Sequence, residues 1–338
     1  MPRRRPLPHH ALLRAALLAA VLAAPGAASA QAPGASPSPA SLPTALVGAF
    51  DALFSGPHAG RRAVHAFGAL VEGQFTPAVD APQLSRAPHL GGPAVPVLVR
   101  FSNFAAVPGL PDGHPDASPR GMAIRFLLPG GIDTDIVAHS YDGFPAATPE
   151  SFLAFLRALP DPAQRAAFAA RHSAARTFLE HPKPAPESYA TEAFFGVSAL
   201  RFTNAAGIVR HGRYRITPLA GLSHLSPEQA ATRPPAFLSA ELESRLGRGP
   251  VLFRLAVQLA EEGDPVDDGS QPWPEGRPEV EIGTLSILRP VPEDDERQRD
   301  LAFVPTNLVG GIAPSADPML KARTQSYRVS ADRRMVAP

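Results

Sequence analysis

The chain has 338 residues, of which 44% are apolar and 19% are charged, so it can bury a large core. It contains no cysteine, which excludes disulfides, thiolate metal sites, iron–sulfur clusters and cysteine nucleophiles. The formal charge is +1, but the first thirty residues carry four arginines and no acid. The remainder has 28 basic and 31 acidic residues, a net charge of −3, and no basic block. Nucleic-acid binding is therefore not expected.

The N-terminus has the pattern of an export signal. Three arginines at residues 3–5 precede an apolar stretch at residues 11–24, and the Ala-Ser-Ala sequence at residues 28–30 forms a small-x-small cleavage site. The apolar stretch is too short to span a membrane. A tethered membrane anchor is the alternative interpretation. We expect a signal peptide at residues 1–30, cleavage after Ala30, and a mature protein that is periplasmic or secreted and not bound to a membrane.

The remainder is expected to form one domain after a short linker. Residues 31–42 are rich in Pro, Ala and Ser, which predicts a flexible linker. No internal repeat or composition break divides residues 43–338. A helical pattern covers residues 43–55, and further helices are expected at about residues 149–158, 161–180, 236–246 and 316–327.

Eight strand-like segments occupy much of the remaining chain. They are residues 64–75, 96–103, 121–128, 134–139, 194–204, 212–218, 251–259 and 279–288. Helices do not alternate with these strands one for one, so a closed antiparallel barrel is favoured over a parallel sheet. The predicted fold is α+β, an eight-stranded antiparallel β-barrel with surrounding helices.

Two predicted strands carry residues that could support chemistry. His65 lies at the start of one strand, just after Arg62, and Ser102 follows Arg100 in another. A histidine in an apolar strand is more often a core residue than a functional one, and a lone serine indicates little. The arginines are more informative, because a buried guanidinium needs an anionic partner and no acid occurs at the matching strand positions. An anionic ligand would supply that partner.

A second region lies near the C-terminus, at residues 319–327, followed by Arg333 and Arg334. Arg323 and Tyr327 are four residues apart, so on a helix they share a face. Taken alone, the pair most simply indicates a tyrosine stacked on a surface arginine. The functional interpretation is a phenolate held by the guanidinium beside a metal. Tyrosinate is one of the few axial ligands that proteins provide to haem iron.

The order of several short motifs makes the chain resemble the haem catalases, specifically the short exported catalase-related peroxidases. The matching motifs are R-x-x-H at residues 62–65, V-R-F-S at 99–102, P-R-G-x-A-x-x-F at 119–126, a W-D-L-V-like strand at 134–137, an N-x-x-P-G-I-x-P-S-like segment at 307–315, and R-x-x-S-Y at 323–327. Each motif alone is weak, but together they cover residues 45–335 in the family's order.

The resemblance implies that residues 43–338 form a single catalase-like domain with haem b buried between the barrel and the helices. On the distal side it makes His65 the acid–base group, oriented by Ser102, with Val64 narrowing the distal face. On the proximal side it makes Tyr327 the iron ligand, with Arg323 bonding its oxygen. The remaining cofactor contacts implied are Phe152 near the haem and Arg62, Arg100 and Arg334 on the two propionates.

The chain departs from the family pattern at several points. The distal asparagine of catalases falls at His139, which could still donate a hydrogen bond to peroxide, although a shift of one residue would place Ser140 there. Asp332 stands where an arginine is usual. The N-terminal arm is short and no flavodoxin-like tail follows. These differences argue against efficient dismutation, tetramer threading and nicotinamide binding.

The predicted function is a haem-dependent peroxidase that reduces hydrogen peroxide or organic peroxides with an organic electron donor, with weak catalase activity. A possible homodimer is expected. The shorter chain should leave a wider access channel, which favours organic peroxides and bulky donors. One alternative is an exported haem-binding barrel without turnover, but it does not explain His65 and Ser102. Another is a barrel for a small apolar ligand, which leaves Arg323 and Tyr327 unexplained.

Overall fold

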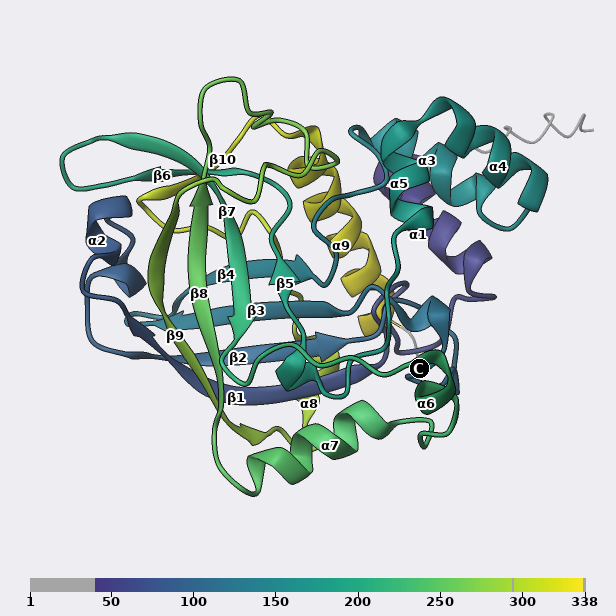
Figure 1. The fold of residues 1–338 in the computed structure, drawn as a ribbon, viewed down its shortest axis with the longest axis horizontal. Coiled ribbons are helices and arrows are strands. Elements are labelled where there is room, and N and C mark those ends of the chain that lie inside the picture. Colours follow the sequence, from purple (N-terminus) through teal and green to yellow (C-terminus); the bar gives the residue numbers. More distant parts are fainter. Residues whose placement is uncertain (1–39, 294, 337–338) are drawn as a thin grey trace, which may run out of the picture. The chain divides into compact units, whose positions relative to one another are not determined.

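The computed structural model of the protein describes residues 40–293 and 295–336, so the predicted signal peptide and residues 31–39 of the predicted linker lie outside the described residues. At its centre is a closed antiparallel barrel of eight strands (Figure 1). Because β9 pairs with β1, and β7 pairs with both β5 and β8, the ring closes. In order around the ring the strands are β1 (Gly68–Pro77), β2 (Val95–Ser102), β3 (Gly121–Leu128), β4 (Ile132–His139), β5 (Phe194–Phe195), β7 (Val209–Pro218), β8 (Val251–Leu259) and β9 (Glu279–Pro290). Two short strands, β6 (Leu200–Thr203) and β10 (Ile312–Pro314), extend the sheet beyond β7. The predicted eight-stranded barrel is confirmed.

The barrel interior is apolar because side chains alternate along each strand. In β2, Val97, Val99 and Phe101 belong to the main core cluster, together with Phe126 of β3 and Phe253 of β8. The intervening side chains of β2 point to the outer face of the barrel. On strands β2 to β4 this outer face is covered by helices, so polar side chains there are sheltered from solvent without entering the core.

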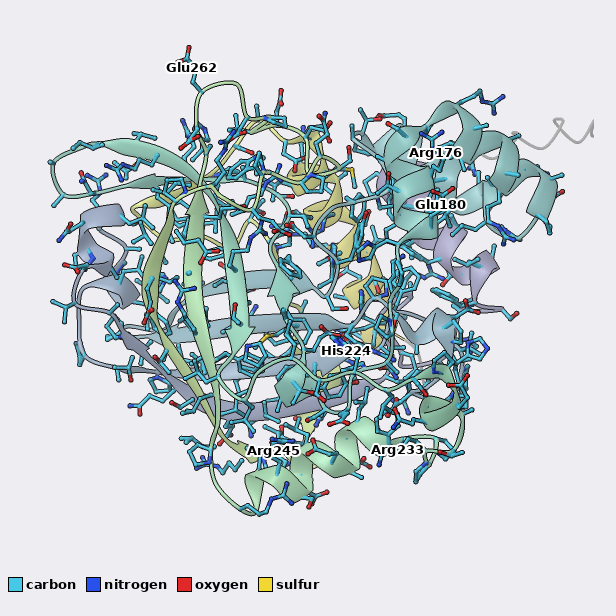
Figure 2. All side chains as sticks on the ribbon, in the orientation of Figure 1. Arg176, Glu180, His224, Arg233, Arg245 and Glu262 are labelled. Carbon is cyan, nitrogen blue, oxygen red and sulfur yellow. The ribbon has the colours of Figure 1, made fainter. Side chains whose placement is uncertain are left out.

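Helices cover one side of the barrel. They are α1 (Leu42–Leu53), α3 (Pro149–Ala158), α4 (Pro162–Arg171), α5 (Ser173–Glu180) and α9 (Pro318–Val336), and they share a second apolar cluster. The yellow α9 lies between the barrel and the group formed by α3, α4 and α5 (Figure 1). Charged side chains such as Arg176 and Glu180 of α5 are exposed (Figure 2). The other helices are α2 (Ala81–Leu84), α6 (Pro227–Ala231), α7 (Phe237–Leu246) and α8 (Glu296–Asp300), with 3-10 turns η1 (Pro88–Leu90), η2 (Pro115–Ala117) and η3 (Tyr189–Thr191).

Within residues 40–293 and 295–336, every helix is too short or too polar to cross a bilayer.

Local features corrected several predicted boundaries. Residues 64–67 are not part of β1, because His65 has a φ of +56°, which an extended strand does not allow. The predicted strand 194–204 is two strands, since the chain leaves the barrel at Gly196, which packs against Tyr214. The predicted helix 161–180 breaks at His172, whose backbone is extended and whose ring packs at a tilt against Phe168, with ring centroids 4.0 Å apart.

The last helix extends nine residues past the predicted end, to Val336. Two arginines hold its final turns. Their charged side chains do not continue an apolar helical pattern, so the sequence did not predict these turns. Arg334 donates to the carbonyl oxygens of Arg299 and Leu301, and Arg333 pairs with Asp51 of α1 at 2.6 Å.

A buried polar network fixes the ends of β2 and β3. Asn103 follows the last residue of β2, and Arg120 precedes the first residue of β3. Arg120 Nη1 donates to Asn103 Oδ1 at 2.5 Å, and Asn103 Nδ2 donates to Asp112 Oδ1 at 2.5 Å. The backbone N–H of Leu238 donates to the second Asp112 oxygen at 2.8 Å. These hydrogen bonds hold the two strand ends in one relative position, although Arg120 Nε is buried without a partner among the described residues.

Removing the carboxylate from this network should destabilise the fold. We expect Asp112→Ala to lower the free energy of unfolding by about 3–5 kcal/mol, because Arg120 would stay buried without its neighbouring negative charge. Chemical denaturation measures the change. The matched control is Asp116→Ala, an exposed carboxylate four residues away, which should change stability by less than about 0.5 kcal/mol. Equal effects of the two substitutions would contradict the structural role of the network.

Candidate functional site

The register of three strands builds one wall of a cavity between the barrel and the helices. Ser102 of β2 pairs with Gly121 of β3, and Gly121 pairs with His139 of β4, so the three residues form a row across the outer face. The neighbouring row begins with Arg100 and contains Ala123 and Val137. All six residues line a cavity of about 220 Å³. Alternation along the strands therefore directs the polar residues away from the barrel core.

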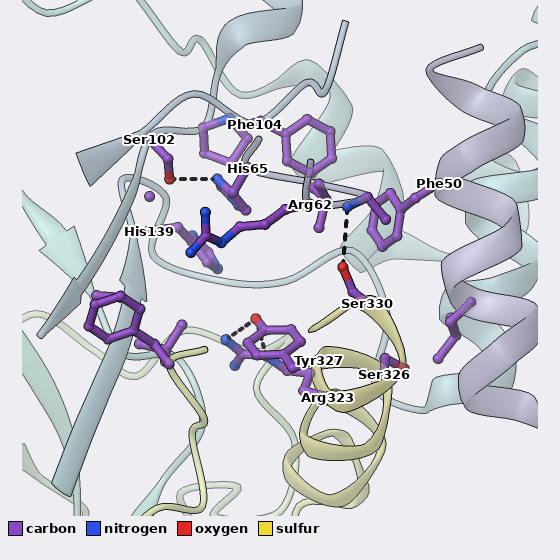
Figure 3. A pocket seen from close by; sticks show the side chains of 18 of the residues that line it. Phe50, Arg62, His65, Ser102, Phe104, His139, Arg323, Ser326, Tyr327 and Ser330 are labelled. Carbon is purple, nitrogen blue, oxygen red and sulfur yellow. Dashed lines mark hydrogen bonds between the residues drawn. The ribbon is translucent and has the colours of Figure 1, made fainter. Parts of the chain in front are cut away.

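The loop between α1 and β1 places His65 beside this row of strand residues. Its backbone N–H donates to the carbonyl oxygen of Phe104 at 2.9 Å, and its ring packs edge-on against Phe104. Its Nδ1 lies 3.1 Å from Ser102 Oγ (Figure 3). A Cβ at position 121 would lie 2.6 Å from Ser102 Oγ and 2.8 Å from His65 Nδ1. Gly121 is thus the residue that leaves room for the serine–histidine pair.

His139 contributes a second imidazole to the same wall. Its Nδ1 accepts a hydrogen bond from the backbone N–H of Tyr141 at 3.4 Å, so in the neutral ring the proton is on Nε2. This Nε2 is buried without a hydrogen-bond partner among the described residues. The neighbouring Ser140 bonds instead to the backbone N–H of Arg120 and does not line the cavity. His139, and not Ser140, is therefore the residue that faces the site.

Both imidazoles are held neutral. Burial, assisted by the positive charge of Arg100, lowers the pKa of His65 to about 3. Burial also lowers the pKa of His139 to about 3, assisted by the charge of Arg323. A neutral imidazole can both accept and donate a proton, whereas an imidazolium can only donate.

Tyr327 faces these residues from the opposite side of the cavity, as Figure 3 shows. It lies on α9, whose start is capped by Asp317 through the N–H of Met319 at 2.8 Å. One turn before the tyrosine, Arg323 donates from Nε and Nη2 to the phenol oxygen at 3.3 and 3.2 Å. Two donors aimed at one oxygen stabilise negative charge on it. The predicted pairing of Arg323 with Tyr327 on one helix face is confirmed.

Three arginines line one part of the cavity without a carboxylate partner among the described residues. Arg62 donates to the carbonyl oxygens of Gln298 and Leu301, Arg100 to that of Ala66, and Arg334 to those of Arg299 and Leu301. Burial lowers the pKa of each, and for Arg100 the value is about 10. Carbonyl dipoles only partly offset the cost of burying three positive charges, so the cluster is suited to an anion.

Aromatic side chains form most of the remaining wall. Phe152 of α3 contacts Phe50 and Phe144, with ring centroids 6.0 and 4.7 Å away. Val64 lines the cavity beside His65. All residues proposed from the sequence therefore border one cavity. Sequence reasoning assigned no role to Gly121, although it lies in the P-R-G motif, nor to Phe50 and Phe104, whose positions depend on tertiary packing.

Comparisons with known proteins identify the family of this chain. The family model described as Catalase matches residues 52–337. The chain belongs to the catalase family. The catalase-related peroxidase of Mycolicibacterium paratuberculosis is 38% identical over 291 residues, covering 83% of this chain and 92% of that protein. The catalase-related peroxidase of Synechococcus elongatus is 30% identical over 290 residues, covering 82% of this chain and 85% of that protein. A fungal catalase structure has the same fold, with a TM-score of 0.74 at 23% identity over 85% of this chain and 62% of the fungal chain.

Membership in the catalase family makes the two-sided arrangement the expected location of the active site. Within this arrangement, His139 stands where the motif resemblance places the distal asparagine of catalases. Both side chains offer an N–H donor. The imidazole differs in that it can also take up a proton in acid, so this chain has two titratable groups on one wall of the cavity where the family pattern has one.

The neutral histidines should make the haem-free protein less stable in acid. Their folded pKa values, about 3, lie below the ordinary value of 6.5. Their contribution is therefore complete above pH 6.5 and is lost as the pH falls toward 3, because in that window the unfolded chain binds protons that the folded chain does not. We expect His139→Asn to reduce the loss of unfolding free energy between about pH 6 and pH 4.5 by about 1.4 kcal/mol per pH unit.

Denaturant titrations of wild type, His139→Asn and His114→Asn at the two pH values measure this slope. The last variant changes an exposed histidine and should behave as the wild type. If His139→Asn kept the full acid sensitivity, the neutral state of His139 in the folded protein would be refuted.

Proposed function

We propose that the chain is a haem-dependent peroxidase that reduces organic peroxides and hydrogen peroxide, with weak catalase activity. The observation that carries this proposal is the pairing, across one cavity, of a serine-bound neutral histidine with an arginine-bound tyrosine. The relatives described as catalase-related peroxidases support the same activity.

The residues present fit a haem. Within the described parts of the chain, no three His, Asp or Glu side chains gather to hold a bare metal ion, so a metal beside Tyr327 would need most of its ligands from a cofactor. Tyr327 would hold the haem iron through its phenol oxygen, and Arg323 would stabilise the phenolate. The cluster of Arg62, Arg100 and Arg334 would bind the two propionates, and the Val64 and Phe152 side chains would pack near the ring. When bound, haem supplies the redox-active iron that exchanges electrons with the peroxide.

The two histidines are complementary to a hydroperoxide. To accept a proton on Nε2, His65 must carry its own proton on Nδ1 and donate it to Ser102 Oγ, at the observed 3.1 Å. His139 has the opposite arrangement, because its Nδ1 accepts from the backbone and its Nε2 donates. A hydroperoxide offers one O–H donor and two oxygen acceptors. His65 would therefore accept its proton while His139 donates to it.

Proton transfer by His65 follows from this placement. His65 takes the proton from the peroxide O–H and returns it to the other oxygen, which leaves as water or an alcohol. Ser102 keeps the ring in the required tautomer throughout. His139 stays neutral and holds the substrate by its Nε2–H. Because both rings are neutral over the ordinary pH range, neither adds positive charge that would oppose the proton uptake.

The cavity walls favour peroxides with an apolar substituent, since Phe50, Phe144, Phe152, Phe155 and Leu156 all line it. An organic molecule would supply the electrons that complete the cycle.

We also propose that residues 1–30 direct export, so that the mature enzyme begins at Gln31 and acts in the periplasm or outside the cell. An exported haem-binding barrel is disfavoured, because storage needs neither the serine-bound His65 nor the donor on His139.

Loss of the acid–base group should slow the reaction with peroxide without loss of haem. We expect His65→Ala to lower the rate constant for reaction of the haem-loaded protein with hydrogen peroxide by about a hundredfold or more. Stopped-flow absorbance measures this rate, and the resting spectrum shows whether haem is retained. His114→Ala, at an exposed position, is the matched control and should react as the wild type. An unchanged rate in His65→Ala would remove this residue from the mechanism.

A further inference from the structure

A second cavity of about 400 Å³ lies beside the first. It is formed by α1, the loop that follows it, and the end of α9. Val47, Arg62, Ala63 and Ser330 line both cavities. The partition between them includes a hydrogen bond from the backbone N–H of Ala63 to Ser330 Oγ at 3.3 Å, visible in Figure 3. An occupant of the second cavity would therefore lie against the arginine edge of the first.

The second cavity has an excess of positive charge. Its charged side chains are Arg61, Arg62, Arg333 and Asp51. Arg333 and Asp51 form an ion pair at 2.6 Å, so their charges cancel. The remaining two arginines pair with no carboxylate among the described residues, and burial and neighbouring arginines lower the pKa of Arg62. His58, also on the wall, is bonded through Nε2 to the carbonyl oxygen of Phe54 at 3.0 Å.

The excess remains after the proposed cofactor is counted. Two propionates would balance two of the three arginines Arg62, Arg100 and Arg334, and would leave one positive charge. Arg61 adds another, and it is exposed on the cavity wall. The rest of the wall is apolar and includes Val47, Phe54 and Ala106. A molecule with one negative charge and one aromatic ring matches these surfaces.

We propose that the second cavity binds the reducing substrate, a small phenolic carboxylate, at the propionate edge of the cofactor. This inference rests on the proposed peroxidase function. Each donor molecule loses one electron and one proton from its phenol group, so two donors reduce one hydroperoxide to an alcohol and one water. The carboxylate binds Arg61 and Arg62, and the ring packs on Phe54. The peroxide and the donor thus occupy separate cavities and do not compete.

Binding of a matched pair of ligands tests the proposal without any peroxide. The probes are 4-hydroxyphenylacetate and 4-hydroxyphenylacetamide, which share ring and hydroxyl and differ in charge. Calorimetric titration into the haem-loaded protein should show the carboxylate binding at least about fivefold more tightly than the amide. Arg61→Gln should remove this difference by weakening only the carboxylate, and Arg61→Lys should restore part of it. Arg86→Gln, at another exposed arginine, should leave both affinities unchanged.

Equal affinities of the two probes in the wild type would overturn the proposal. An unchanged carboxylate affinity in Arg61→Gln would also overturn it, because the carboxylate would then bind elsewhere, including in the first cavity. Under turnover with peroxide, Arg61→Gln should raise KM for the carboxylate donor and leave kcat unchanged. Failure of the peroxide reaction together with intact selective binding would count against the proposed function and not against the site.

Discussion

The pairing register of β2, β3 and β4 is the constraint on which the site depends. It aligns Ser102, Gly121 and His139 in one row on the outer face of the barrel. A slip of one residue would turn these positions into the apolar core and expose the core residues instead. The buried network of Asn103, Asp112 and Arg120 holds the strand ends in this register. The fold thus places polar groups against a closed apolar barrel, and the helices then shelter them from solvent.

Uncompensated positive charge links the two cavities. Burial of Arg100 and Arg334, which are 7% and 3% exposed, costs free energy that backbone carbonyls only partly offset. An anionic cofactor would remove this cost and stabilise the folded chain by its binding. The same arginine edge forms the wall of the second cavity, where Arg61 extends the positive charge toward solvent. By our two proposals, this positive charge would bind the cofactor and the electron donor side by side.

Much of this arrangement could be predicted from the sequence. The apolar segments at residues 121–128 and 251–259 form strands with the predicted bounds. The Arg323–Tyr327 spacing was sufficient to place both on one helix face. The positive φ of His65 was not predictable, because it accompanies a tertiary hydrogen bond to Phe104. The residue types around His65 are those of an apolar strand. The role of Gly121 and the orientation of His139 also depend on contacts across strands, and so does the second cavity, whose residues come from both ends of the chain.

By our proposal, Tyr327, held by Arg323, binds haem opposite His65. The most direct test is the visible absorption spectrum of the mature protein and of Tyr327→Phe after reconstitution with haem, before and after one equivalent of hydrogen peroxide. We expect a high-spin ferric spectrum typical of tyrosinate ligation in the wild type, which changes on addition of peroxide, and loss of that spectrum in Tyr327→Phe. Identical spectra in the two proteins, or no haem binding by the wild type, would contradict it.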